Sequence, residues 1–301
     1  MIQKFLINSP ALPKEIFQIL LSIIDEAILE ITERKISDDL IVFNLRKRVK
    51  NLRALLKLLR KEFGEEFYKK NNFSLRDVNR RSTAIRNFSA LIKVCEILKS
   101  ASSDPICNEA LNLLQSRIES DFEDVKRKTD YDALLNFYKN QLGKYKTRLL
   151  HNEIDSNRFS NIKYGLYKIY SDGKKNFAMV INNPESEVLH DWRKNAKDLY
   201  YSLLSLTPLW KPVILGYTKE IKLLSDMLGE LHDLYEFKLY IQSLIDNPFD
   251  FTSVIYFIES QNSSLLEESG SLGKKIYAED EEQFSERIKK YYTGYKREFK
   301  K

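Results

Sequence analysis

The sequence contains little cysteine, glycine or proline for its length. Only two of its 301 residues are cysteines, Cys95 and Cys107, which excludes a disulfide framework. We expect both thiols to be free and buried, in a reducing cytoplasm. The nine glycines and seven prolines are few for a chain of this length. This scarcity disfavours an all-β or loop-rich fold and favours long helices.

The chain also lacks a long apolar run. Its most apolar stretch, Ile16 to Ile31, is interrupted by Gln, Ser, Asp and Glu residues, which is typical of an amphipathic helix and not of a membrane span. The N-terminal segment has no sustained apolar run either, so no secretory signal is expected. A hydrophobic content of 43% with 31% charged residues predicts a globular cytoplasmic protein that buries a sizeable core.

Acidic residues are missing from one stretch in particular. The segment 43–61, FNLRKRVKNLRALLKLLRK, contains eight Lys or Arg and no Asp or Glu, although the net charge of the whole chain is only +6. Its apolar residues recur at helical spacing, and a stripe of cations follows a second face of the same helix: Arg46, Lys50, Arg53, Lys57 and Arg60. Like charges in one row repel one another, so their partners have to come from another helix or from a bound anion.

Helical periodicity and break signals predict an all-α chain. We predict helices over 13–32, 38–64, 74–101, 106–128, 131–150, 155–181, 185–206 and 212–246, followed by two or three shorter helices. Asn71-Asn72 is expected to form a turn and Ser74 to cap the third helix. A break is possible at 171–173, and the basic end, 289–301, is expected to be a frayed helix or a tail.

A second segment repeats the layout of the first basic helix. In the segment 189–206, LHDWRKNAKDLYYSLLSL, Arg193 and Lys197 stand 147 positions after Arg46 and Lys50, at the same spacing. Such a repeat suggests two similar helical halves related by pseudo-two-fold packing, which we place at 1–150 and 151–301. Packed in this way, the two basic stripes can face each other across a shared groove.

The second copy resembles the CHAD family, the conserved histidine α-helical domain. The family signature, His-Asp-x-Arg-x-x-x-Lys, is matched by His190, Asp191, Arg193 and Lys197. The preceding segment GLYKIYSDGKKNF resembles the Tyr-containing basic turn of the family, with Lys174 on it, and the later segment LSDMLGELHD resembles its Leu-Gly…His-Asp run. The resemblance covers about 20–240. It implies two four-helix bundles related by a pseudo-two-fold axis around a basic channel that binds inorganic polyphosphate without catalysis.

The first half departs from the family pattern at several positions. Phe43 replaces the first His, Asn44 the Asp after it, and Asn87 the Asp that usually follows Arg86. In the second half, Tyr200 replaces an Arg. The Arg and Lys positions mostly persist, so anion binding that depends on charge alone should persist as well.

A polyphosphate chain needs donors spaced along a line, because each phosphate presents its own charged oxygens. Arginine offers a planar fork to two of these oxygens, whereas lysine offers a mobile point charge. The predicted polyphosphate-binding residues are Arg46, Lys50, Arg53, Lys57, Arg80, Arg86, Lys174, His190, Arg193, Lys194 and Lys197. No metal or cofactor is expected. Some of these cations could instead pair with carboxylates such as Asp77 or Glu230. A protein of this kind could act as a scaffold or as a targeting module on polyphosphate granules.

Three alternatives remain open at this point. His190 could donate to phosphate, more strongly when protonated, or it could be structural and hydrogen-bond a carboxylate such as Asp233. The order His151, His190-Asp191, Asp233 is also that of metal-dependent phosphohydrolases of the HD type, although nearby cations disfavour a divalent metal. RNA binding would need exposed aromatic residues beside the basic stripe, and we expect Trp192 and Tyr200-Tyr201 to be core residues instead.

Overall fold

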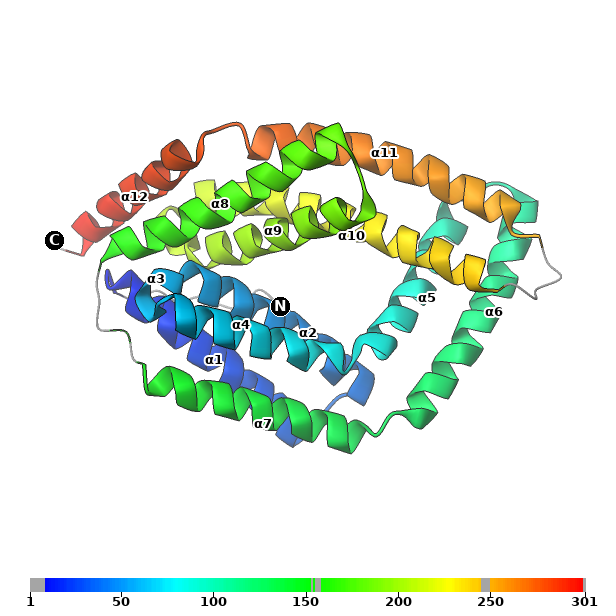
Figure 1. Cartoon of the computed structure of the whole chain (residues 1–301), viewed down its shortest axis with the longest axis horizontal. Coiled ribbons are helices and arrows are strands. Elements are labelled where there is room, and N and C mark those ends of the chain that lie inside the picture. Colours follow the sequence, from blue (N-terminus) through cyan, green and yellow to red (C-terminus); the bar gives the residue numbers. More distant parts are fainter. Residues whose placement is uncertain (1–8, 153, 155–157, 245–249, 300–301) are drawn as a thin grey trace.

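The computed structural model describes residues 9–152, 154, 158–244 and 250–299, and every regular element within these ranges is helical. They contain twelve α-helices and one short 3-10 helix and no strand, as the sequence predicts (Figure 1). The helices are α1 Leu12–Glu33, α2 Asp38–Leu58, α3 Arg60–Phe63, α4 Glu65–Arg80, α5 Thr83–Ala101, α6 Pro105–Lys128, α7 Tyr131–Leu150, α8 Phe159–Asn182, α9 Ser186–Ser205, η1 Thr207–Leu209, α10 Lys211–Ser243, α11 Thr252–Ile276 and α12 Glu281–Glu298.

Single residues account for several helix ends. Pro105 is the first residue of α6, and the side chain of Asp104 accepts a hydrogen bond from the backbone N–H of Ile106 at 3.0 Å. Asp130 caps α7 in a similar way. Gly64, with φ of 83°, separates α3 from α4 in a conformation that other residues rarely adopt. The predicted limits of these helices are therefore close to the observed ones.

The predicted turn at Asn71-Asn72 is wrong. Both residues lie within α4, which begins at Glu65, so Ser74 is inside a helix and caps nothing. The helix continues because both amides bind cations of other helices: Asn71 Oδ1 accepts from Arg148 Nε at 2.6 Å, and Asn72 Oδ1 accepts from Arg53 Nε at 2.8 Å. The break lies instead between α4 and α5.

Two expectations near the C-terminal half are also corrected. The segment 171–173 lies inside α8 and does not break it. Gly173 is needed there for packing, since a Cβ would come within 2.5 Å of the Tyr277 hydroxyl. The basic end is helical as far as Glu298. Its Tyr292 stacks on Phe159 and donates a hydrogen bond to the carbonyl of Pro10 at 2.8 Å, so the described part of this segment is packed. The end predicted for the helix over 212–246 lies outside the described residues.

The buried apolar residues form one large core and one smaller cluster. The large core takes most of its residues from α1, α2, α4, α7, α8, α9, α10 and α12, with single residues from α5, α6 and α11, on both sides of the predicted boundary at 150/151. The smaller cluster joins α5, α6, the end of α10 and the start of α11, which lie together at one end of the molecule (Figure 1). The division into 1–150 and 151–301 stays a prediction.

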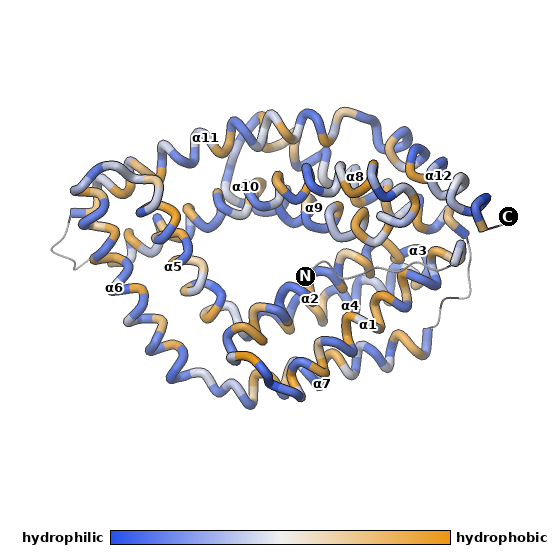
Figure 2. The backbone as a smooth tube through the Cα atoms, turned by 180° about the vertical axis from the view of Figure 1, so that it is seen from behind, coloured by the Kyte–Doolittle hydropathy of each residue, from blue (hydrophilic) through white to orange (hydrophobic). Residues whose placement is uncertain are grey.

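Helix α2 lies against α1 on one side and against α9 on the other. Helix α8 also crosses the end of α2 at Gly165, where a Cβ would come within 2.1 Å of the Leu58 carbonyl oxygen. Figure 2 shows polar and apolar residues mixed along the helices. In the described part of the chain, none of the helices is long and apolar enough to cross a membrane.

Candidate anion-binding site

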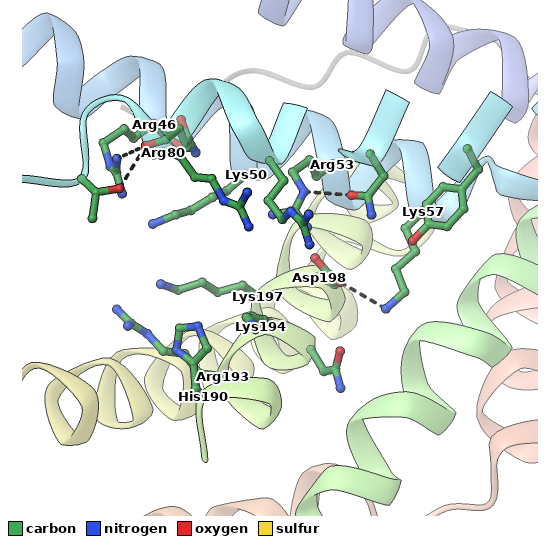
Figure 3. Close-up of a pocket in the computed structure, with 16 residues that line it drawn as sticks. Arg46, Lys50, Arg53, Lys57, Arg80, His190, Arg193, Lys194, Lys197 and Asp198 are labelled. Atoms are coloured by element: carbon green, nitrogen blue, oxygen red, sulfur yellow. Dashed lines mark hydrogen bonds and ion pairs between the residues drawn. The ribbon is translucent and has the colours of Figure 1, made fainter. Parts of the chain in front are cut away.

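A pocket of about 410 Å³ lies between α2, α4 and α9, and we call it the cationic pocket. Of its lining side chains nine are Lys or Arg, whereas a single one, Asp198, is acidic. The first wall comes from the predicted stripe on α2 and from α4, and the second comes from the repeated motif on α9 (Figure 3). The basic residues of the two repeated segments therefore meet at one place.

Neutral groups hold Arg46 of α2. Arg46 donates from one nitrogen to the Asn79 carbonyl at 2.5 Å and to the Ser82 hydroxyl at 2.8 Å. Ser82 is fixed in turn by the Tyr138 hydroxyl at 2.8 Å. Burial lowers the pKa of Arg46, and none of these partners neutralises its charge. The guanidinium group is thus oriented before any ligand arrives.

Lys50 on α2 and Lys197 on α9 extend into the gap from opposite walls (Figure 3). Neither ammonium group has a hydrogen-bond or ion-pair partner among the residues that the structure describes. Burial, with added repulsion from Arg193, Arg46 and Arg86, lowers the pKa of Lys50 to about 8. Burial, with repulsion from Arg193, Lys50 and Arg86, lowers the pKa of Lys197 to about 6. Because buried charges are normally paired, the charged forms of these two lysines are left uncompensated in the pocket.

Lys57 lies on the same stripe in a different environment. Its ammonium group is 3.0 Å from Asp172 on α8 and 3.2 Å from Asp198 on α9. Burial alone would lower the pKa of Lys57, but the two carboxylates outweigh it and raise the pKa above its ordinary value. Lys57 therefore joins three helices by ion pairs and is already neutralised.

Arg86 on α5 and Arg193 on α9 share one carboxylate. Arg86 donates to Asp233 at 2.5 Å, and Arg193 lies 4.0 Å from the same oxygen. Burial lowers the pKa of Arg193 although Asp233 opposes the shift. One carboxylate between two guanidinium groups leaves net positive charge here.

His190 is a neutral group in this pocket. Its ring lies edge-on to His232, with 4.8 Å between the ring centroids, and its Nδ1 is buried with no hydrogen-bond partner in the described ranges. Burial, followed by repulsion from Lys194, His232 and Arg193, lowers the pKa of His190 to about 4. The alternative in which His190 hydrogen-bonds Asp233 is not observed. Near neutral pH the ring is therefore uncharged.

Nine of the eleven predicted site residues line the cationic pocket: Arg46, Lys50, Arg53, Lys57, Arg80, His190, Arg193, Lys194 and Lys197. Two of these are paired locally, Arg80 with Asp77 at 3.0 Å and Lys194 with Asp191 at 2.8 Å. Arg86 lines a neighbouring pocket. Lys174 is not brought to the site, because its ammonium group donates to the Glu279 carbonyl at 2.7 Å.

Apart from Arg80, sequence reasoning missed the α4 side of the pocket. Asn72, Arg76 and Asn79 of α4 also line it, and their spacing of three and four residues would have placed them on one helical face. The predicted turn at Asn71-Asn72 hid this pattern.

The ligand order proposed for a metal-dependent phosphohydrolase is not assembled. His151 lies at the end of α7, where its Nδ1 is 2.7 Å from the Thr147 carbonyl. Within the part of the chain that the structure describes, no group of three or more His, Cys, Asp or Glu residues could hold a metal ion.

The fold and the pocket together define an all-α protein that gathers uncompensated cations from two repeated helices. The model of the CHAD domain family matches residues 32–239, and the chain belongs to this family. The resemblance stated from the sequence is thereby confirmed over nearly the same range. Comparison with curated proteins found no match.

Proposed function

We propose that this protein binds inorganic polyphosphate in the cationic pocket and does not turn it over. The observation that carries the proposal is the unpaired state of Lys50 and Lys197, between the oriented guanidinium groups of Arg46 and Arg193. Bringing four cations together with only the carboxylate of Asp233, which is already shared with Arg86, is costly unless an anion with several charged groups joins them. Membership of the CHAD family, whose members are generally non-catalytic polyphosphate-binding modules, supports the same conclusion.

Within this proposal the pocket residues have different roles. Arg46, Lys50, Arg193 and Lys197, which we call the cation junction, contact the phosphates directly, and Arg53 extends the row along α2. Lys57 maintains the packing of the α8 and α9 walls through its two carboxylates. The helices around the junction would correspond to two four-helix bundles related by a pseudo-two-fold axis, with the pocket as part of their shared groove. Retention on polyphosphate granules, as a scaffold or targeting module, is the proposed output.

Binding of long-chain polyphosphate at increasing salt tests the proposal. Charge-assisted hydrogen bonds contribute about 1.5–3 kcal/mol each, so Lys50→Gln with Lys197→Gln should weaken binding by at least about a hundredfold. By analogy with single-stranded nucleic acid, the slope of log affinity against log salt should fall by about 0.7 for each lost phosphate contact.

The matched control removes the same charge elsewhere. Lys128→Gln with Lys144→Gln changes two exposed lysines that line neither the cationic pocket nor the neighbouring one. Its affinity should stay close to that of the wild type. Equal losses of affinity in the two double variants would mean that polyphosphate binds diffusely over the surface. Release of orthophosphate from polyphosphate by the purified protein would contradict the proposal that the protein does not turn polyphosphate over.

A further inference from the structure

A second pocket of about 380 Å³ adjoins the cationic pocket and shares the cation junction with it. It is lined from α2, α5, α9 and α10, and we call it the aromatic pocket. Because both pockets are lined by the same four cations, a ligand in the aromatic pocket reaches the charges proposed to bind polyphosphate.

Three aromatic residues distinguish this pocket: Phe43, Tyr200 and Tyr201. Phe43 is 60% exposed at the start of α2, unlike Trp192, which is fully buried in the core. The rings of Tyr200 and Tyr201 are 5.1 Å apart and tilted by 59°. Tyr200 packs against the large core, as expected, and both tyrosines are also partly exposed to this pocket. Phe43 and Tyr200 are also two of the positions at which the chain departs from the family pattern.

The carboxylates of the aromatic pocket are already occupied. Eight of its lining side chains are Lys or Arg and three are Asp. Asp39 accepts a hydrogen bond from the Tyr131 hydroxyl, Asp226 pairs with Lys222, and Asp233 pairs with Arg86. These pairings leave the two lysines of the cation junction available to an incoming anion.

We propose that the aromatic pocket binds a nucleoside di- or triphosphate, with its base against Phe43 and Tyr200 and its phosphates on the cation junction. The inference rests on the proposed function insofar as both ligands use the same four cations. Several phosphates are needed to satisfy four cations, and a planar ring is needed to cover an exposed aromatic wall. A volume of about 380 Å³ suits one base with its sugar and not the several stacked bases of a single-stranded RNA.

Comparison of ATP with inorganic tripolyphosphate, both without divalent cations, isolates the contribution of the nucleoside. Base stacking on aromatic side chains should make ATP bind roughly 5- to 150-fold more tightly than tripolyphosphate. Phe43→Ala should reduce the affinity for ATP to that for tripolyphosphate and leave the affinity for tripolyphosphate unchanged. Phe43→Trp, which keeps a ring, should retain the preference. Tyr256→Ala is the control, because Tyr256 is 68% exposed on α11 and lines neither pocket.

The outcomes separate this inference from the proposed function. If the wild type binds ATP no more tightly than tripolyphosphate, or if Phe43→Ala weakens both equally, the nucleotide site is overturned while polyphosphate binding stands. The wild type could instead bind ATP tightly, lose this affinity on Phe43→Ala, and fail to bind polyphosphate. That result would support the nucleotide site and overturn the proposed function. The last outcome concerns an RNA oligonucleotide without a terminal triphosphate. If it binds as tightly as ATP and Phe43→Ala weakens its binding, the aromatic pocket is a nucleic-acid site and the inference is overturned.

Discussion

Replacing Lys197 by methionine should stabilise the ligand-free protein, although the side chain lies in the proposed binding site. The change removes an ionisable group whose charged form has no partner among the described residues, and it keeps a side chain of similar length. The folded protein lowers the pKa of Lys197 from 10.5 to about 6. At pH 7 this difference corresponds to an upper bound on the order of 5 kcal/mol. Water that reaches the partly exposed ammonium group reduces this cost, so we expect a gain of at least about 1 kcal/mol.

Urea unfolding followed by circular dichroism measures this gain, and Lys57→Met is the matched control. Lys57 occupies the same pocket, but its loss leaves Asp172 and Asp198 without their cation, so Lys57→Met should destabilise the protein. Opposite signs for the two substitutions are expected, together with weaker polyphosphate binding by Lys197→Met. If Lys197→Met destabilises the protein as Lys57→Met does, the description of Lys197 as an uncompensated cation is wrong.

The dependence of stability on pH gives the same reasoning a second test. Between the folded pKa of about 6 and the ordinary value of 10.5, the unfolded chain binds more protons at Lys197 than the folded protein does. The free energy of unfolding therefore rises with pH in this window, and the destabilisation is complete below it. With the folded pKa at about 6, raising the pH from 7 to 9 should stabilise the wild type by up to about 2.7 kcal/mol more than Lys197→Met. Equal pH dependence in the two proteins would contradict the lowered pKa.

Two further predictions concern packing and proton linkage. Gly165→Ala should destabilise the protein by about 2 kcal/mol or more in urea unfolding, because the new Cβ meets the Leu58 carbonyl oxygen, whereas Gly143→Ala, with open space around it, should be neutral or stabilising. Polyphosphate binding should take up about one proton at pH 7.5, because the ligand returns the pKa values of Lys197 and Lys50 toward their ordinary range. Calorimetry in buffers of different ionisation enthalpy measures this uptake, which Lys197→Met should largely abolish.

Local signals in the sequence were sufficient for most helix limits. The helix predicted over 131–150 is observed as Tyr131–Leu150, because Asp130 supplies a cap. The turn expected at Asn71-Asn72 failed for a tertiary reason. The partners of these amides, Arg148 and Arg53, lie on other helices, and no local sequence pattern predicts these contacts.

The cations of the α2 stripe were predicted correctly, but the sequence did not show which of them are paired with carboxylates and which are not. Lys50 and Lys57 are two turns apart on one helix face and look equivalent in the sequence. Their difference arises because Asp172 and Asp198, from α8 and α9, meet Lys57, while Arg193 and Lys197 meet Lys50. Which lysine stays uncompensated depends on helix packing that periodicity does not encode.

The repeat explains why the cation junction has two different pockets beside it. Arg46 and Lys50 on α2 correspond to Arg193 and Lys197 on α9, and the structure brings all four together. One turn further the copies diverge, because Tyr200 stands where α2 carries Arg53. Arg53 lines the cationic pocket, whereas Tyr200 lines the aromatic pocket. We infer that a ligand of either pocket needs phosphate groups, because both pockets share the same four cations. The diverged positions then determine which other chemical groups each pocket accepts.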